Sequence, residues 1–174
     1  MGHATERFVM RSISCVLVLV AASATLAQAP SPNVPYMLTI SAPSAKVVVG
    51  EPVWIQVTLE NTSDSDVTIV KSRASELGEL TYDVDVVTTN GARVQLTPYG
   101  RALHGEPTTP PIVIQNSPHA LTLKPHQKFA DTILLSKIYE LTPGDYIVRV
   151  HKAQRPESGG KLFSNTLRLT ILPN

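Results

Sequence analysis

Short segments in which apolar and polar residues alternate limit most strongly how this chain can fold. In the clearest segment, residues 53–60, every second residue from Val53 to Leu59 is apolar. This period of two places alternate side chains on opposite faces of an extended strand. No segment sustains the 3.6-residue period of an amphipathic helix. The sequence therefore predicts a fold made of strands.

Similar segments recur along the chain, and turn-forming residues separate them. They lie at residues 38–41, 47–49, 67–70, 82–87, 121–123, 129–135, 146–150 and 167–171. Short strands at this spacing are typical of a β-sandwich or β-barrel. We expect an all-β fold of about seven to nine strands.

Local signals predict the connections between these strands. Asn90-Gly91 is the strongest short hairpin signal, because both central residues of the tight turn need a positive φ. The returning strand would be residues 93–96. Single helical turns are expected at 74–77 and 136–141, a turn at 155–160, and a further short strand at 112–114.

The N-terminal segment has the features of an export signal. Arg7 and Arg11 precede an apolar run at residues 15–22, and small residues follow. The run is too short to span a bilayer. We expect a signal peptide at 1–27 that is cleaved after Ala27, a Pro-rich leader at 28–35 and one domain at 36–174. The mature protein would be secreted or periplasmic, with no membrane insertion.

The charge balance excludes partners that bind through bulk charge. The chain has 15 Lys and Arg against 14 Asp and Glu, and losing Glu6, Arg7 and Arg11 with the signal leaves 13 of each. Nucleic-acid binding needs a basic excess, so we expect no nucleic-acid partner. The single cysteine, Cys15, also leaves with the signal. The exported domain therefore has no disulfide and depends on an apolar core.

Three groups of residues resemble the immunoglobulin-like domains of bacterial exported proteins. The resemblance implies an immunoglobulin-like antiparallel β-sandwich that acts as a binding, adhesion or spacer module. The absence of a cysteine pair, and a Trp54 on the outward strand face, distinguish the chain from antibody-type domains. The similar stretches are 49–53 with 59–64, 121–125, and 141–148 with 164–166.

Four residues are predicted to have structural roles. Tyr146 stands just after Pro143-Gly144, at a position similar to the tyrosine corner of sandwich folds, where the hydroxyl bonds to nearby backbone. Gly144 would shape the entrance to that strand. Asn90 and Gly91 would form the hairpin turn.

The sequence contains no catalytic or metal-binding motif, so we expect neither enzyme activity nor a cofactor. It has no Gly-x-Ser-x-Gly, His-Glu-x-x-His or glycine-rich phosphate loop. The acidic pairs at 64 and 66 and at 83 and 85 are predicted to be a turn and a solvated strand face, not a calcium site. The histidines lack metal-ligand spacing and are expected on the surface; they are His104, His119, His126 and His151.

The segment 98–118 is the predicted functional loop, because it is long and holds five prolines. Trp54, Tyr99 and Arg101 are the candidate binding residues, since these residue types are enriched in binding hot spots. We expect a non-catalytic exported binding module that contacts another envelope or extracellular protein through its loops or a sheet edge. The alternatives are a protease inhibitor that presents this loop, and a binder of carbohydrate or a metal ion.

Overall fold

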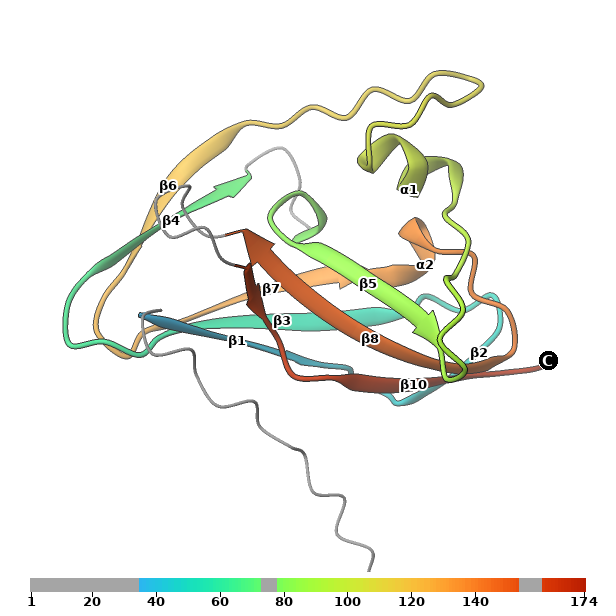
Figure 1. Ribbon diagram of the computed structural model, residues 1–174, viewed down its shortest axis with the longest axis horizontal. Coiled ribbons are helices and arrows are strands. Elements are labelled where there is room, and N and C mark those ends of the chain that lie inside the picture. Colours follow the sequence, from blue (N-terminus) through green and yellow to red (C-terminus); the bar gives the residue numbers. More distant parts are fainter. Residues whose placement is uncertain (1–34, 73–77, 154–160) are drawn as a thin grey trace, which may run out of the picture.

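Ten strands make up about half of the chain that the structure describes, and helices are few and short, so the predicted all-β fold class is confirmed (Figure 1). The computed structural model describes residues 35–72, 78–153 and 161–174. The predicted signal peptide, the leader up to residue 34, the helical turn at 74–77 and the turn at 155–160 lie outside these residues. No helix in the described ranges is long and apolar enough to cross a membrane.

Two sheets pack against each other to form a sandwich. The first has the order β1-β3-β7, and the second has the order β2-β10-β8-β5, with β9 paired to β8. The strand pairs are antiparallel, as predicted, except β2 with β10, which are parallel. The bounds are β1 (Tyr36–Ser41), β2 (Lys46–Val48), β3 (Trp54–Asn61), β5 (Asp83–Thr88), β7 (Lys128–Leu134), β8 (Gly144–Ala153), β9 (Lys161–Phe163) and β10 (Leu167–Leu172).

The alternating pattern of β3 explains the core. Val53, Ile55, Val57 and Leu59 are buried, whereas Trp54 on the opposite face is 37% exposed. The second sheet contributes the facing apolar layer, which includes Val84, Val86, Val148, Val150, Leu169 and Ile171. Burying these side chains supplies the main favourable free energy of folding.

A second ribbon of two strands continues the pairing of β3 with β7. It consists of β4 (Val67–Ser72) and β6 (Pro118–Leu123). The first ladder ends where Glu60 pairs with Lys128, and the second begins where Val67 pairs with Leu123. The same two chain segments therefore pair twice, with a bend in each segment between the ladders. Figure 1 shows the β4–β6 ribbon turning away from β3 and β7 at the left-hand end of the sheet.

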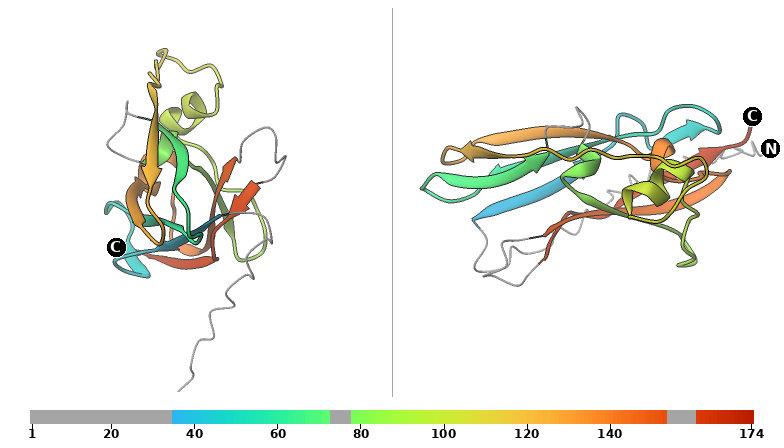
Figure 2. Two further views of the ribbon diagram at one scale, coloured as in Figure 1. Left: turned by 90° about the vertical axis from the view of Figure 1, so that its left-hand side faces the viewer. Right: turned by 90° about the horizontal axis from the view of Figure 1, so that it is seen from above.

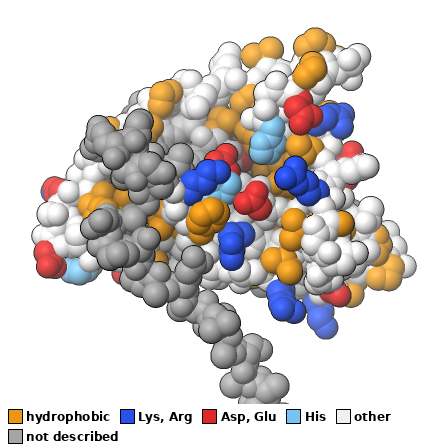
Figure 3. Space-filling model, in the orientation of Figure 1, with side chains coloured by type: hydrophobic (Ala, Val, Ile, Leu, Met, Phe, Trp, Pro, Cys, Tyr) orange, Lys and Arg blue, Asp and Glu red, His pale blue; other side chains and the backbone are white. Residues whose placement is uncertain are grey.

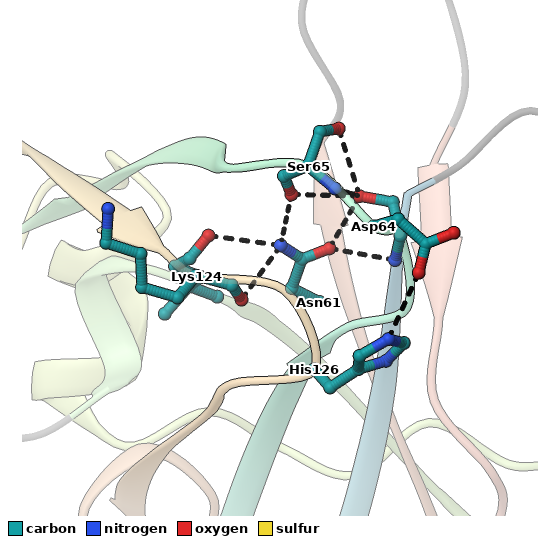
Figure 4. Close-up of polar contacts among 7 residues, drawn as sticks. Asn61, Asp64, Ser65, Lys124 and His126 are labelled. Carbon is teal, nitrogen blue, oxygen red and sulfur yellow. Dashed lines mark hydrogen bonds and ion pairs between the residues drawn. The ribbon is translucent and has the colours of Figure 1, made fainter.

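Asn61 fixes this double bend (Figure 4). Its side chain is fully buried, and its Nδ2 donates to the carbonyl oxygens of Ser65 (2.7 Å), Leu123 (3.0 Å) and Lys124 (2.9 Å). Its Oδ1 accepts hydrogen bonds from the backbone N (2.9 Å) and the hydroxyl (2.8 Å) of Ser63. One side chain thus satisfies backbone groups in both bends, which would otherwise lose their hydrogen bonds on burial.

Two exposed polar contacts add a weaker link between the two bends. Lys124 Nζ lies 2.8 Å from Asp66 Oδ2, and His126 Nε2 lies 3.3 Å from Asp64 Oδ1. Surface pairs of this kind contribute at most about 1 kcal/mol. The buried amide of Asn61 is therefore the dominant polar interaction at the bend.

The predicted hairpin at Asn90-Gly91 is present only next to its turn, where the Thr88 N donates to the Ala92 carbonyl oxygen (2.9 Å) and Val87 forms an isolated antiparallel bridge with Arg93. Residues 93–96 form no strand, and β5 pairs along its length with β8. Gly91 has φ +84°, whereas no positive φ occurs at Asn90. The Asn90 side chain instead accepts hydrogen bonds from the Thr88 hydroxyl and, at 3.3 Å, from the backbone N of Ala92. Residues 95 and 96 leave β5 because they pair with residues 139 and 140 near α2.

In the described ranges three short helical elements connect the strands: η1 (Gly78–Leu80), α1 (Pro98–Leu103) and α2 (Leu135–Ile138). The helical turn expected at 136–141 is present as α2. The predicted loop 98–118 instead begins with α1, and its residues 112–114 are not a strand. β9 was not predicted, because a strand of three residues is too short to show an alternation of apolar and polar side chains.

We predict that Asn61→Ala destabilises the protein strongly, because it leaves buried carbonyl and amide groups in both bends without partners. The expected loss is on the order of 3 kcal/mol in the free energy of unfolding, measured by urea denaturation. Gln56→Ala, at an exposed position of the same strand, is the control and should change stability little. Equal stability of the two variants would contradict the role of Asn61.

Candidate functional site

A strap crosses the molecule between α1 and β6; we define it as residues 104–117. Figure 1 shows it running above the sandwich, and the left view of Figure 2 shows it with α1 at the top, away from β1 and β10. Its C-terminal end enters β6, which the paired β4 holds in register. Its N-terminal end is held by α1.

α1 is fixed by close packing on α2. A Cβ atom added at Gly100 would lie 2.1 Å from the carbonyl oxygen of Ile138, so only glycine permits this approach. Thr97 caps α1 by accepting a hydrogen bond from the Gly100 N (3.0 Å), and its hydroxyl donates to the Lys137 carbonyl oxygen (2.6 Å). The start of the strap is therefore anchored to α2.

A buried carboxylate joins α1 and α2 to η1. The Glu79 side chain is 1% exposed, and its Oε1 accepts hydrogen bonds from the Tyr99 hydroxyl (3.0 Å) and Lys137 Nζ (3.1 Å). Lys137 Nζ also lies 3.9 Å from the centre of the Tyr99 ring. Burial raises the pKa of Tyr99. Burial lowers the pKa of Lys137, but hydrogen bonds to Glu79 and Tyr99 outweigh it and raise that pKa overall.

A cavity of about 320 Å³ lies between the strap and the sandwich. Leu103, His104 and Asn116 contribute to its lining from α1 and the strap. The rest of the lining comes from η1, β5, the end of α2 and β8, and consists of Glu79, Leu80, Thr81, Tyr82, Asp83, Val84, Ile138, Tyr139 and Lys152. The predicted loop 98–118 thus forms one side of an open pocket.

Two aromatic hydroxyls of the cavity wall are strongly shielded from water. The Tyr139 hydroxyl donates to the Val84 carbonyl oxygen, and burial, with the charges of Asp85 and Asp83 adding, raises its pKa to about 12. Burial and then the charge of Asp131 raise the pKa of Tyr82. Both phenols therefore stay protonated at neutral pH and act as hydrogen-bonding groups, not as bases.

Two half-buried lysines link the β4–β6 ribbon to the sandwich. Lys152 Nζ donates to the carbonyl oxygens of Val70 (2.9 Å) and Thr81 (3.2 Å), and burial lowers its pKa. Lys71 forms a buried ion pair with Asp131, and its Nζ lies 4.3 Å from the centre of the Phe129 ring. Polar contacts thus hold the β4–β6 ribbon to the sandwich at the side where the apolar core ends.

His151 is buried, so its expected surface position is wrong. Its side chain is 9% exposed; Nε2 lies 3.1 Å from Asp83 Oδ2, and Nδ1 lies 3.2 Å from Asp85 Oδ2. The Phe163 ring on β9, 5.4 Å from the imidazole, helps to cover it. Figure 3 shows charged side chains of both signs and histidines gathered in the middle of this face. Because β9 was not predicted, the burial of His151 beneath it was not predicted either.

The three predicted binding residues do not form one site. Tyr99 is half-buried and points to Glu79, and Arg101 Nη1 donates to the Leu96 carbonyl oxygen (3.2 Å). Trp54 lies on β3, opposite Leu134. Within the described residues, no hydrogen bond, ion pair or ring contact joins Trp54 to Tyr99 or Arg101. The first two hold the strap in place, and only Trp54 is classed as exposed.

The predicted structural residues lie at strand ends and turns. The buried Tyr146 donates its hydroxyl to the Thr142 carbonyl oxygen (2.7 Å) and accepts from the Thr142 N (3.1 Å). Gly144, at φ +154°, begins β8. Among the residues that the structure describes, no group of three or more His, Cys, Asp or Glu side chains could hold a metal ion.

Comparisons with known proteins give a distant likeness in structure alone. No family model matches the chain, and no curated protein matches its sequence. The C-terminal domain of Wzt is 7% identical, with 80% of this chain and 75% of that chain covered and a TM-score of 0.42. The β-glucosidase EmGH1 from Erythrobacter marinus is 9% identical, with 79% of this chain and 15% of that chain covered and a TM-score of 0.39. Neither likeness carries an argument about activity.

We predict that Lys137→Met destabilises the protein because the buried Glu79 loses its cation. The expected loss is on the order of 2 kcal/mol, measured by chemical denaturation. Adding Glu79→Gln should recover part of this loss, since the double variant has no uncompensated buried charge. If the double variant loses the sum of the two single effects, the two side chains are not coupled and the interpretation is wrong.

Proposed function

We propose that the protein is a non-catalytic, exported binding module that presents its strap to a partner protein in the envelope or outside the cell. The observation that carries this proposal is Val113, which is 83% exposed near the middle of a segment anchored at both ends. Ile112 beside it is also exposed. An apolar side chain held in solvent by a fixed scaffold is a feature of protein-binding loops.

The strand arrangement supports an immunoglobulin-like scaffold for this module. The N-terminal strand β1 pairs with β3 in one sheet, whereas β2, the next strand, pairs in parallel with the last strand, β10, in the other. The hydroxyl of Tyr146 bonds to backbone four residues upstream, as in a tyrosine corner. Such sandwiches are rigid supports, and function is located in their loops.

Local hydrogen bonds order the strap before any partner binds. The Thr108 hydroxyl accepts from the Ile112 N (2.9 Å) and donates to the Pro110 carbonyl oxygen (3.0 Å). Pro110 and Pro111 restrict the backbone further. A segment that is already ordered loses less conformational entropy on binding, which favours affinity.

The exposed side chains and backbone of the strap indicate how it would contact a partner protein. Val113 and Ile112 would enter an apolar pocket of the partner, where burial of their side chains supplies affinity. Residues 113–117 pair with no strand of the described chain, so their backbone is available to a partner strand. A partner with the cleft of a protease would make the protein an inhibitor, because such a cleft binds an extended segment with one apolar side chain in a pocket.

We predict that Val113→Asp abolishes binding to the partner without changing stability, because a carboxylate cannot enter an apolar pocket. A photo-crosslinking residue at position 113, introduced in the native host, should capture one envelope or extracellular protein reproducibly. The same residue at position 70 is the matched control, since Val70 is 59% exposed but lies on β4.

Added Val113→Asp protein should fail to compete with the 113 crosslink, whereas added wild-type and Val70→Asp proteins should suppress it. Inhibition assays with a panel of purified proteases test whether the protein acts as a protease inhibitor. Absence of any crosslink specific to position 113, together with no inhibition of the proteases, would contradict the proposal.

A further inference from the structure

The chain protects most of the free edges of its sheets. On β1, Asn165 Oδ1 accepts from the Ile40 N (2.7 Å), and its Nδ2 donates to the Ile40 carbonyl oxygen (3.1 Å). On β5, the Tyr139 hydroxyl donates to a backbone carbonyl oxygen. β2 has only three residues, and β7 carries Lys128 at its start and the inward-pointing Asp131. Short strands, charged side chains and side-chain caps keep an edge from pairing with another chain.

Hydrogen bonds of β4 show which way the backbone of the β4–β6 ribbon points. The Ser72 N donates to the Thr81 hydroxyl (3.2 Å), and the Val70 carbonyl oxygen accepts from Lys152 Nζ (2.9 Å). Both β4 residues therefore direct these backbone groups away from β6. In an antiparallel pair, the residues opposite such positions also point their backbone N–H and C=O groups outward. The bonds of β4 thus close its own edge and fix the orientation of β6.

β6 has none of these forms of protection among the described residues. Ala120 lies opposite Val70 and Thr122 lies opposite Thr68, so the backbone groups of Ala120 and Thr122 point outward. Both residues are exposed, and no described residue hydrogen-bonds to these backbone groups. The sequence has no Asp, Glu, Lys or Arg from position 107 to position 123. An exposed, uncharged edge of this kind pairs readily with another strand.

The β6 strand of a second copy matches this edge in hydrogen bonding and in charge. In an antiparallel pair centred on Leu121, Ala120 faces Thr122 of the second copy, and the two residues exchange both N–H···O bonds. A two-fold axis repeats this pair on its other side. The half-buried Leu121 side chains meet at the axis, where closer spacing buries more of each. Lys124 faces Pro118, so no like charges meet, and Pro118 ends the pairing because it has no N–H.

We propose that two copies of the protein associate through β6 about a two-fold axis and form one antiparallel sheet in the order β4-β6-β6-β4. Residues 120–122 form the contact. Val113 precedes β6 and lies outside it, so this association does not depend on the proposed partner-binding function. A dimer presents two straps, and two linked binding segments hold a partner more tightly than one when both can engage.

The first test is analytical ultracentrifugation of the protein, purified from its native host, over a concentration series. It should show a reversible equilibrium between monomer and dimer. Ala120→Pro removes an outward N–H that β4 does not use, and it should weaken the dimer on the order of tenfold or more. Thr122→Lys brings like charges together near the axis and should act in the same way if the proline variant does not fold. Val70→Lys, on the neighbouring strand and 59% exposed in the wild type, is the control and should dimerise normally.

A disulfide tests the register of the pair. In the proposed dimer the two Leu121 Cα atoms face each other at about 4.5 Å, a distance that a disulfide spans, so Leu121→Cys should crosslink two copies on oxidation. Val70→Cys is the control and should not crosslink. Both variants contain Cys15, so the control accounts for any crosslink through that residue. The proposal is overturned if the protein is monomeric at every concentration, if neither Ala120→Pro nor Thr122→Lys weakens the dimer, or if Leu121→Cys forms no crosslink between copies.

Discussion

The side-chain amide of Asn61 is the interaction on which the rest of the structure depends. Two chain segments that are paired as β3 and β7 must bend together and pair again as β4 and β6. Each bend leaves backbone groups that neither ladder satisfies, and one buried amide serves both bends through five hydrogen bonds. The position of β6 fixes one end of the strap, and the end of β4 leads toward η1 and Glu79. Both the displayed segment and the cavity under it therefore follow from this bend.

Polar contacts hold the ribbon to the sandwich where the apolar core ends. Lys71 with Asp131, Lys137 with Glu79, and Lys152 with two backbone carbonyls all bridge elements that are far apart in sequence. Ion pairs that are buried cost desolvation, so they add geometric specificity more than stability. The region beneath the strap is consequently well defined in geometry but less strongly stabilised than the apolar layer around Val57 and Val148. Binding sites commonly occupy such regions.

Local patterns in the sequence predicted the strands but not the contacts between distant elements. The alternation of residues 53–60 gave the buried and exposed faces of β3 correctly, because a period of two depends on backbone geometry alone. Asn90-Gly91 predicted the turn correctly, but the returning segment pairs with β5 only at Arg93, because residues 95 and 96 pair instead with residues 139 and 140. Asn61 directly follows the alternating segment 53–60, and no local signal distinguishes a buried amide there. His151 was misplaced because its cover comes from β9. The hydrogen bond of Tyr99 to Glu79 was not predicted, because the two residues are twenty positions apart.

Hydrogen exchange of the Asn61 side-chain amide, followed by NMR with the exposed Asn90 as reference, tests the central claim most directly. If the double bend depends on this group, its Nδ2 hydrogens exchange only when the whole domain unfolds. Their protection then equals that of the slowest backbone amides in β3 and β7. Exchange of the Asn61 amide as fast as that of Asn90, in a domain whose β3 amides stay protected, would contradict the account.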